Sequence, residues 1–240
     1  MTKLYNRKYF DTIFDNMPFI ANADDYFWVG GSGNWSDINH WATTSGGTVY
    51  HTQLPGSTDD VFFDSNSGLN SSDTVFFTVQ TNYAHDFEVS IPTAVPTFYG
   101  APTNVLRIYG SCDVSTLIRW ELKGTLYFES SSAGETIAFS DTLKEVYFNA
   151  SGNWSGSDTL YAANITVGAG TFSLSSGQLL QADTLDVLSG ASLSLNGSTL
   201  LTGYTEISSG ATFTPSGAAV LLERPTGQWY QPYFYYYPTD

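Results

Sequence analysis

Short apolar runs recur along the chain from residue 61 onward, and polar residues and turn formers separate them. Examples are "VFFD" (61–64), "TVFFTVQ" (74–80), "VLRIYGS" (105–111), "TLYFES" (125–130) and "EVYFNA" (145–150). Most runs alternate apolar and polar residues or contain three apolar residues in succession, as strands do. No run in this part of the sequence follows a 3.6-residue period convincingly, so the pattern predicts an all-β protein.

The last third of the pattern repeats with a period near twenty. Three segments align: "ITVGAGTFSLSSGQLL" (165–180), "LDVLSGASLSLNGSTLL" (185–201) and "EISSGATFTPSGAAVLL" (206–222). Gly177, Gly197 and Gly217 are each twenty residues apart, and we expect them at corners that need a positive φ. A fixed period of this length predicts that residues 61–222 form a β-solenoid, that is, a single-stranded parallel β-helix. A β-sandwich is the alternative, although sandwich strands seldom repeat in sequence.

Residues 1–22 show a different pattern. Apolar residues spaced three and four apart predict a short amphipathic helix, which Pro18 ends. The segment also holds three of the eight bases, Lys3, Arg7 and Lys8. It is either a helix that caps the domain or an anchoring arm. As an arm, it would dock on a partner through four aromatic residues, Tyr5, Tyr9, Phe10 and Phe14.

Residues 23–60 are rich in Trp and Gly. The stretch "YFWVGGSGNWSDINHWATTSGG" (26–47) contains Trp28, Trp35 and Trp41, and a shortened copy, "SGNWSGSD", occupies residues 151–158. Because an open solenoid end exposes unpaired strand edges and a slice of core, we predict that this segment is the N-terminal cap. The alternative interpretation is a sugar-binding platform in which Trp35 and Trp41 stack on sugar rings.

Residues 223–240 form an aromatic tail that ends in "QWYQPYFYYYPTD". One interpretation is a last strand that covers the C-terminal end of the coil. The other is a docking strip, because Tyr and Trp dominate the energetics of protein interfaces. The candidate docking residues are Trp229, Tyr230, Tyr233, Phe234 and Tyr235.

The segment "WVGGSGNWSDINHWATTSGG", followed by "PGSTDDVFFDSNSG", resembles a motif widespread in β-helical proteins of tailed phages and in bacterial surface proteins. The resemblance covers about residues 26–220. It implies a β-helical structural protein of a virion, either a capsid decoration or a short fibre, and it favours a trimer. The bacterial proteins usually carry signal peptides, whereas the first twenty residues here lack a long apolar run, which favours the phage side. The expected location is therefore the virion surface, after assembly in the host cytoplasm.

The charge of the chain narrows the classes of partner. The net charge is −15, and charged residues are only 13% of the sequence. Such a field repels nucleic acid and anionic membranes, so we expect neither as a partner. No stretch approaches eighteen apolar residues, and Cys112 is the only cysteine.

The sequence offers little catalytic chemistry. The bases of the body, Arg107, Arg119, Lys123, Lys144 and Arg224, are scattered, and His40, His51 and His85 lack paired spacing. Asp59, Asp60 and Asp64 are the best acidic cluster, but nothing shows them converging on one bond. We therefore expect no enzyme, no metal and no cofactor. Three hypotheses follow, in order: a virion structural protein docked to other virion proteins, a carbohydrate-binding adhesin that recognises host polysaccharide, and a polysaccharide lyase or hydrolase.

Overall fold

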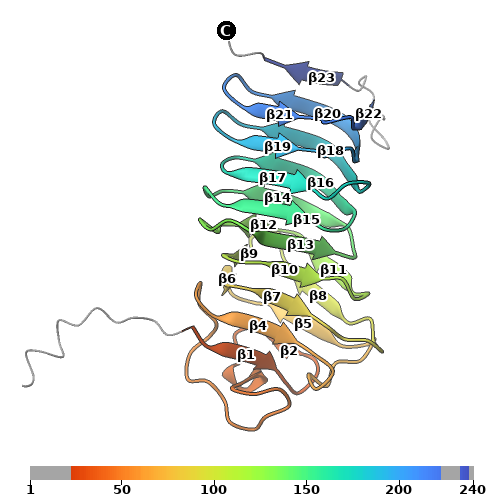
Figure 1. Ribbon diagram of the computed structural model, residues 1–240. Helices are drawn as coiled ribbons and strands as arrows, with labels where there is room; N and C mark the ends of the chain where they lie inside the picture. The colour runs from red at the N-terminus through yellow and green to blue at the C-terminus, as the bar shows by residue number, and fades with distance from the viewer. Residues whose placement is uncertain (1–22, 223–232, 238–240) are drawn as a thin grey trace, which may run out of the picture.

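The computed structural model describes residues 23–222 and 233–237, which form a β-solenoid whose coils stack from the N-terminal to the C-terminal end (Figure 1). The described strands belong to three sheets. Apart from β1 with β3 and one bridge between Ala42 and Tyr50, the described strand pairs are parallel. This arrangement confirms the predicted parallel β-helix and excludes the sandwich. The predicted helix in residues 1–22 lies outside the described residues.

Sheet A is the longest of the three sheets and runs the length of the solenoid. In stacking order its strands are β3 (Trp41–Ala42), β1 (Asp25–Trp28), β4 (Asp60–Phe63), β7 (Phe87–Val89), β10 (Cys112–Val114), β13 (Glu135–Phe139), β15 (Asn153–Gly156), β17 (Thr171–Leu174), β19 (Ser192–Ser194) and β21 (Thr212–Thr214). Because β1 already pairs with β4, the stack begins inside the segment predicted as the cap.

Sheets B and C complete the coils. Sheet B contains β2 (Gly33–Asn34), β5 (Thr74–Phe77), β8 (Thr97–Gly100) and β11 (Arg119–Leu122). Sheet C contains β6 (Thr81–Ala84), β9 (Val105–Ile108), β12 (Thr125–Phe128), β14 (Leu143–Phe148), β16 (Leu160–Val167), β18 (Leu179–Val187), β20 (Thr199–Ile207) and β22 (Ala219–Leu222). A further strand, β23 (Tyr233–Tyr236), also pairs with β20, and one 3-10 turn, η1, spans Ile38–His40.

Coil length changes along the stack. Cys112 pairs with Ile137, 25 positions later, whereas Leu193 pairs with Phe213, 20 positions later. The longer coils have strands in all three sheets, and the shorter coils alternate between sheets A and C. The predicted period of twenty is therefore confirmed for the C-terminal half, and the N-terminal half has wider coils.

The core changes with the width of the coils. Bulky rings such as Trp28, Phe63 and Phe98 fill the wide N-terminal coils, where alternate strand residues point inward. Phe128, Phe148 and Phe172 then stack on one another, with ring centroids 5.1 and 4.5 Å apart. The following coils are filled mainly by Leu, Val and Ile. Because each inward residue packs on residues of the adjacent coils, the solenoid is one continuous core.

Gly177 marks a corner where the backbone has φ of +82°, and a Cβ built there would meet no atom within 4 Å. We expect Gly177→Ala to lower the free energy of unfolding by about 1 kcal/mol, through backbone strain alone. Gly177→Asn should lower it less, because Asn tolerates positive φ. Chemical denaturation followed by circular dichroism measures both. Gly56→Ala, at a glycine without positive φ, is the matched control and should be nearly neutral. Equal losses at both glycines would contradict the corner assignment.

Candidate functional sites at the two ends of the solenoid

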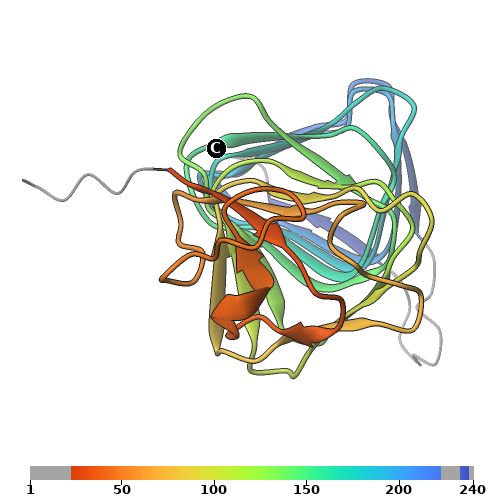
Figure 2. The ribbon, with the colours of Figure 1, turned by 90° about the horizontal axis from the view of Figure 1, so that it is seen from below.

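The N-terminal end is closed by the Trp-rich segment, which crosses the first coil (Figure 2). Trp28, Trp35 and Trp41 are buried, and their rings meet edge to face, with centroids 4.9 Å apart for Trp28–Trp41 and 4.7 Å apart for Trp35–Trp41. The indole N–H of Trp41 donates to the carbonyl of Trp35 at 2.8 Å. Asp37 caps η1 by accepting from the backbone N–H of Asn39. These contacts form the predicted cap.

The sugar-stacking interpretation of Trp35 and Trp41 is wrong for this structure. The residues are 1% and 0% exposed, so neither ring offers a face to a sugar. The single Trp of the shortened copy, Trp154, is likewise buried, within β15. In both copies the sequence Gly-Asn-Trp therefore brings an indole into the core, directly after β2 in the first copy and within β15 in the second.

The C-terminal end differs because no described residues cover part of the core of the last described coil. Strands β22 and β23 lie end to end along one edge of β20, β22 on its first half and β23 on its second half, so together they form the last described level of sheet C. Leu222 and Tyr236 pair with the buried residues Thr202 and Ile207, yet they are 44% and 51% exposed. They face the axis of the solenoid but have no described coil above them. This end therefore presents an apolar surface bordered by unpaired strand edges.

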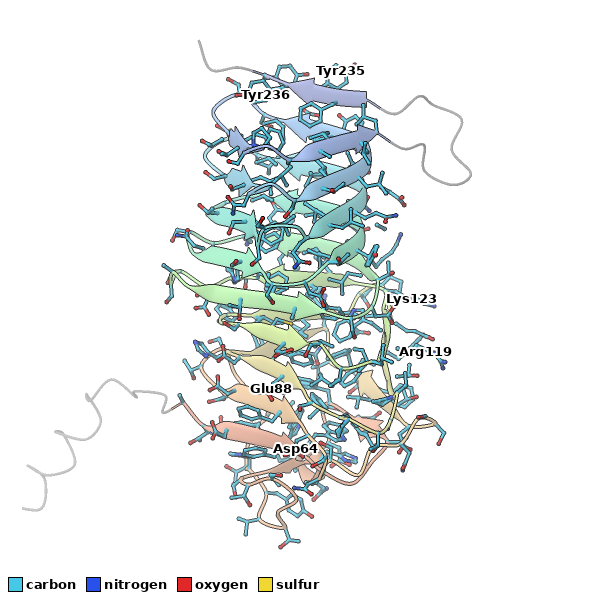
Figure 3. All side chains as sticks on the ribbon, turned by 45° about the vertical axis from the view of Figure 1, so that its right-hand side comes forward. Asp64, Glu88, Arg119, Lys123, Tyr235 and Tyr236 are labelled. Atoms are coloured by element: carbon cyan, nitrogen blue, oxygen red, sulfur yellow. The ribbon has the colours of Figure 1, made fainter. Side chains whose placement is uncertain are left out.

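This C-terminal end also carries no charge in the described chain. Residues 207–222 and 233–237 contain no Asp, Glu, Lys or Arg, although the whole chain carries 23 acids and 8 bases. Tyr235 and Tyr236 lie at this end, while acids such as Asp64 and Glu88 lie on coils near the opposite end (Figure 3). An exposed apolar end without charge is typical of an interaction surface.

The predicted docking residues fall into two groups. Tyr233, Phe234 and Tyr235 lie in β23, at the C-terminal end. The remaining six, Tyr5, Tyr9, Phe10, Phe14, Trp229 and Tyr230, lie outside the described residues. The structure also adds docking candidates that the sequence interpretation missed, Leu222 and Tyr236. The repeat offered a signal for Leu222, because this residue has an inward register position in β22 and no described coil covers it.

A ladder of polar side chains follows one corner of sheet A near the N-terminal end. Asp60 Oδ1 accepts from the backbone N–H of Asp86 at 3.0 Å, Asp86 Oδ1 accepts from Ser111 N–H at 2.6 Å, and Ser111 Oγ accepts from Thr136 N–H at 3.0 Å. His85 Nδ1 lies 2.9 Å from Asp60 Oδ1. Each of these side chains thus accepts a hydrogen bond from a backbone N–H of the next coil. This structural role explains why acidic residues recur at successive coils of this corner.

The same corner brings together three groups that could hold a metal ion, Asp60, His85 and Asp86, whose ligand atoms lie within 4.8 Å of one another. This grouping was not predicted from the sequence, in which His85 has no nearby partner at a metal-ligand spacing. The signal is the spacing, since His85 and Asp86 follow Asp60 by 25 and 26 residues, and the coil from β4 to β7 is 26 residues long. The corner ladder explains the arrangement without an ion.

We expect mild acid to stabilise the protein because of this corner. Burial, followed by neighbouring acids, raises the pKa of Glu88, and burial also raises that of Asp86 despite the bond from Ser111. The folded chain then binds more protons than the unfolded chain above about pH 4, so stability falls as pH rises through the raised pKa values. Because both carboxyls are substantially exposed and solvent screens them, we expect the thermal midpoint to rise by only about 1 °C between pH 8 and about pH 5.

A different carboxylate, Glu129, limits how far the pH can fall before acid begins to destabilise the protein. Burial alone would raise the pKa of Glu129, but bonds from Arg107, Asn149 and Tyr109 outweigh it and lower the pKa. Its stabilising contribution is lost as pH falls below about 4.

The double variant Asp86→Asn/Glu88→Gln tests the first part of this prediction and should flatten the rise in thermal midpoint between pH 8 and 5. An unchanged rise in that variant would place the responsible carboxylates elsewhere.

The outer face of sheet C carries stacked polar and aromatic side chains. The Arg107 guanidinium lies 4.3 Å from the ring centroid of Tyr127 and pairs with Glu129, and the Tyr127 and Tyr147 rings are 5.7 Å apart. Tyr127 and Tyr147 are half-buried against each other. These side-chain contacts join neighbouring strands and therefore stabilise sheet C.

The described residues do not assemble a set of catalytic groups that converge on one cavity. The thiol of Cys112 is fully buried, and burial raises its pKa far above the range of a reactive thiolate.

No helix in the described ranges is both long and apolar enough to span a membrane. No protein-family model matches the chain, and no curated protein sequence or solved structure is significantly similar to it.

Proposed function

We propose that this chain is a structural protein of a tailed-phage virion, a capsid decoration or short fibre held on the particle by one end. One observation carries the proposal: the two ends of the solenoid are unlike. The N-terminal end is closed by buried tryptophans, whereas the described residues of the C-terminal end are apolar and uncharged, and no described coil covers them. A rod with one closed end and one open end suits attachment by the open end.

The remaining surface supports the same role. The body is acidic and rich in Ser, Thr and Gly, which keeps it soluble at high local concentration. The Trp-Gly motif and its resemblance to β-helical phage proteins supply the phage assignment and favour a trimer. The docked partner is another virion protein with an apolar surface and free strand edges, because only such a surface satisfies both the side chains and the backbone of the last coil.

Mass spectrometry of purified, intact particles of the encoding phage tests the proposal. We expect peptides of this chain in the particles. Hundreds of copies relative to the major capsid protein would indicate a capsid decoration, and a few to a few dozen would indicate a fibre. Complete absence from particles would overturn the virion role. Binding to host polysaccharide by the free protein would then favour the adhesin hypothesis.

A further inference from the structure

Sheet B ends at β11, in the middle of the solenoid. Cys112 of β10 pairs 25 positions ahead with Ile137 of β13, but Glu135 of β13 pairs only 19 positions ahead with Trp154 of β15. The loss of about six residues per coil removes the length of one strand. Strand β11 pairs with β8 on one side and has no described strand of its own sheet on the other. The narrowing of the coil thus creates a free strand edge on the side of the molecule.

Successive residues of β11 direct their backbone N–H and C=O groups alternately to the two edges of the strand. Arg119 N–H donates to Pro96, and Lys123 N–H donates to Gly100, both at 2.9 Å toward β8. Trp120 and Leu122 therefore direct their N–H and C=O groups to the free edge. Asp141 Oδ2 accepts from Trp120 N–H at 2.7 Å, in the place of a strand carbonyl. The described residues offer Leu122 N–H no acceptor, so the edge is only partly satisfied.

A groove of about 330 Å³ lies along this edge, between β11 and the start of β14. Trp120, Leu122, Leu143 and Ala163 contribute its apolar lining, and Glu121, Lys123, Thr142 and Lys144 also line it. The groove therefore combines free backbone groups with apolar side chains, two ammonium groups and one carboxylate, so its lining carries a net positive charge. These are the features that an added strand uses for affinity and specificity.

The charges around the groove differ from those of the rest of the molecule. The described residues contain four bases, and Arg107 is paired with Glu129. The other three are exposed and form no ion pair among the described residues. Arg119 lies in β11, Lys123 directly follows β11, and Lys144 lies in β14. Arg119 and Lys123 project from the same side of the solenoid (Figure 3). A chain of net charge −15 thus places the three described bases that lack an ion pair beside the free edge of β11.

We propose that this groove binds an extended acidic peptide segment of another protein as an added parallel strand of sheet B. The residue opposite Glu121 donates to Trp120 C=O and accepts from Leu122 N–H. Its neighbours opposite Trp120 and Leu122 are apolar and face the core, while acids two positions away on either side lie opposite Arg119 and Lys123. The inference does not rest on the virion role, because it concerns the side of the rod rather than its docked end.

A designed peptide tests the proposal with the full chain. The probe is acetyl-Glu-Val-Thr-Val-Glu-amide, which places acids opposite Arg119 and Lys123 and a neutral Thr opposite Glu121. We expect amide chemical-shift changes in residues 119–123 and 141–144, together with slower hydrogen exchange at Leu122 N–H. The matched peptide acetyl-Lys-Val-Thr-Val-Lys-amide should bind about tenfold more weakly. Equal binding of the two peptides, or an unchanged exchange rate at Leu122, would overturn the proposal.

Charge variants of the protein separate the groove from a general electrostatic effect. Arg119→Gln/Lys123→Gln should weaken binding of the acidic peptide about fivefold and keep the thermal midpoint, because both side chains are exposed. Lys3→Gln/Lys8→Gln removes the same charge from the N-terminal segment and should leave the affinity unchanged. Equal weakening by both double variants would contradict a local site. Shifts at Arg119, Lys123 and Lys144 with an anionic polysaccharide but not with the peptide would assign the bases to a glycan instead.

Discussion

Trp41→Ala is expected to lower the free energy of unfolding by about 4 kcal/mol. The ring of Trp41 is fully buried between Trp28 and Trp35 and packs 5.9 Å from Phe63 in the next coil. Its removal leaves a large cavity, and it also leaves the carbonyl of Trp35 without its 2.8 Å donor. Because Trp41 belongs to the strand that covers β1, the loss should also expose the first level of the solenoid to other chains.

Urea unfolding followed by far-ultraviolet circular dichroism measures this loss, and light scattering measures association. Tyr50→Ala is the control within the same segment, because Tyr50 is exposed and should change the free energy by less than about 1 kcal/mol. A stable Trp41→Ala variant that instead loses affinity for carbohydrates would contradict the cap and restore the sugar-stacking interpretation.

The parts of the fold that the sequence predicted are those in which neighbouring coils are alike. Gly177, Gly197 and Gly217 have φ of +82°, +78° and +78°, as expected for repeated corners. In this region one corner conformation repeats at each level, so one residue type repeats in the sequence. The first coils have no such regular corner. Along sheet A they span 35, 26 and 25 residues in turn, so neither these coils nor the third sheet were visible as a period.

The sites were harder to predict because they arise between coils rather than along the sequence. Asp60 meets His85 only after one coil is closed, and the groove beside Trp120 exists only because the next coil is shorter. The two candidate sugar-binding tryptophans show the opposite difficulty. Their neighbours in sequence are Gly, Asn and Ser, which suggests exposure, whereas packing against the first coil buries Trp35 and Trp41.

The proposed docked end leads to the second large effect. We expect Leu222→Glu/Tyr236→Glu to reduce the number of copies on purified particles by at least about 100-fold. Both side chains face the exposed core slice at the C-terminal end, where the described last coil has no charge. A partner that covers this end would bury two unpaired carboxylates, and each costs roughly 2–5 kcal/mol, which is more than enough for that reduction.

The solenoid supplies a matched control for this experiment. Leu188→Glu/Tyr161→Glu makes the same two changes at residues that are 37% and 39% exposed on its side, so the net charge and the residue types are identical. We expect this variant to occupy particles at the normal level. Thermal midpoints of both variants within about 2 °C of the parent would show that the end remains folded. Normal occupancy by Leu222→Glu/Tyr236→Glu would mean that the apolar C-terminal end does not hold the protein on the particle, and attachment would have to lie in the N-terminal segment.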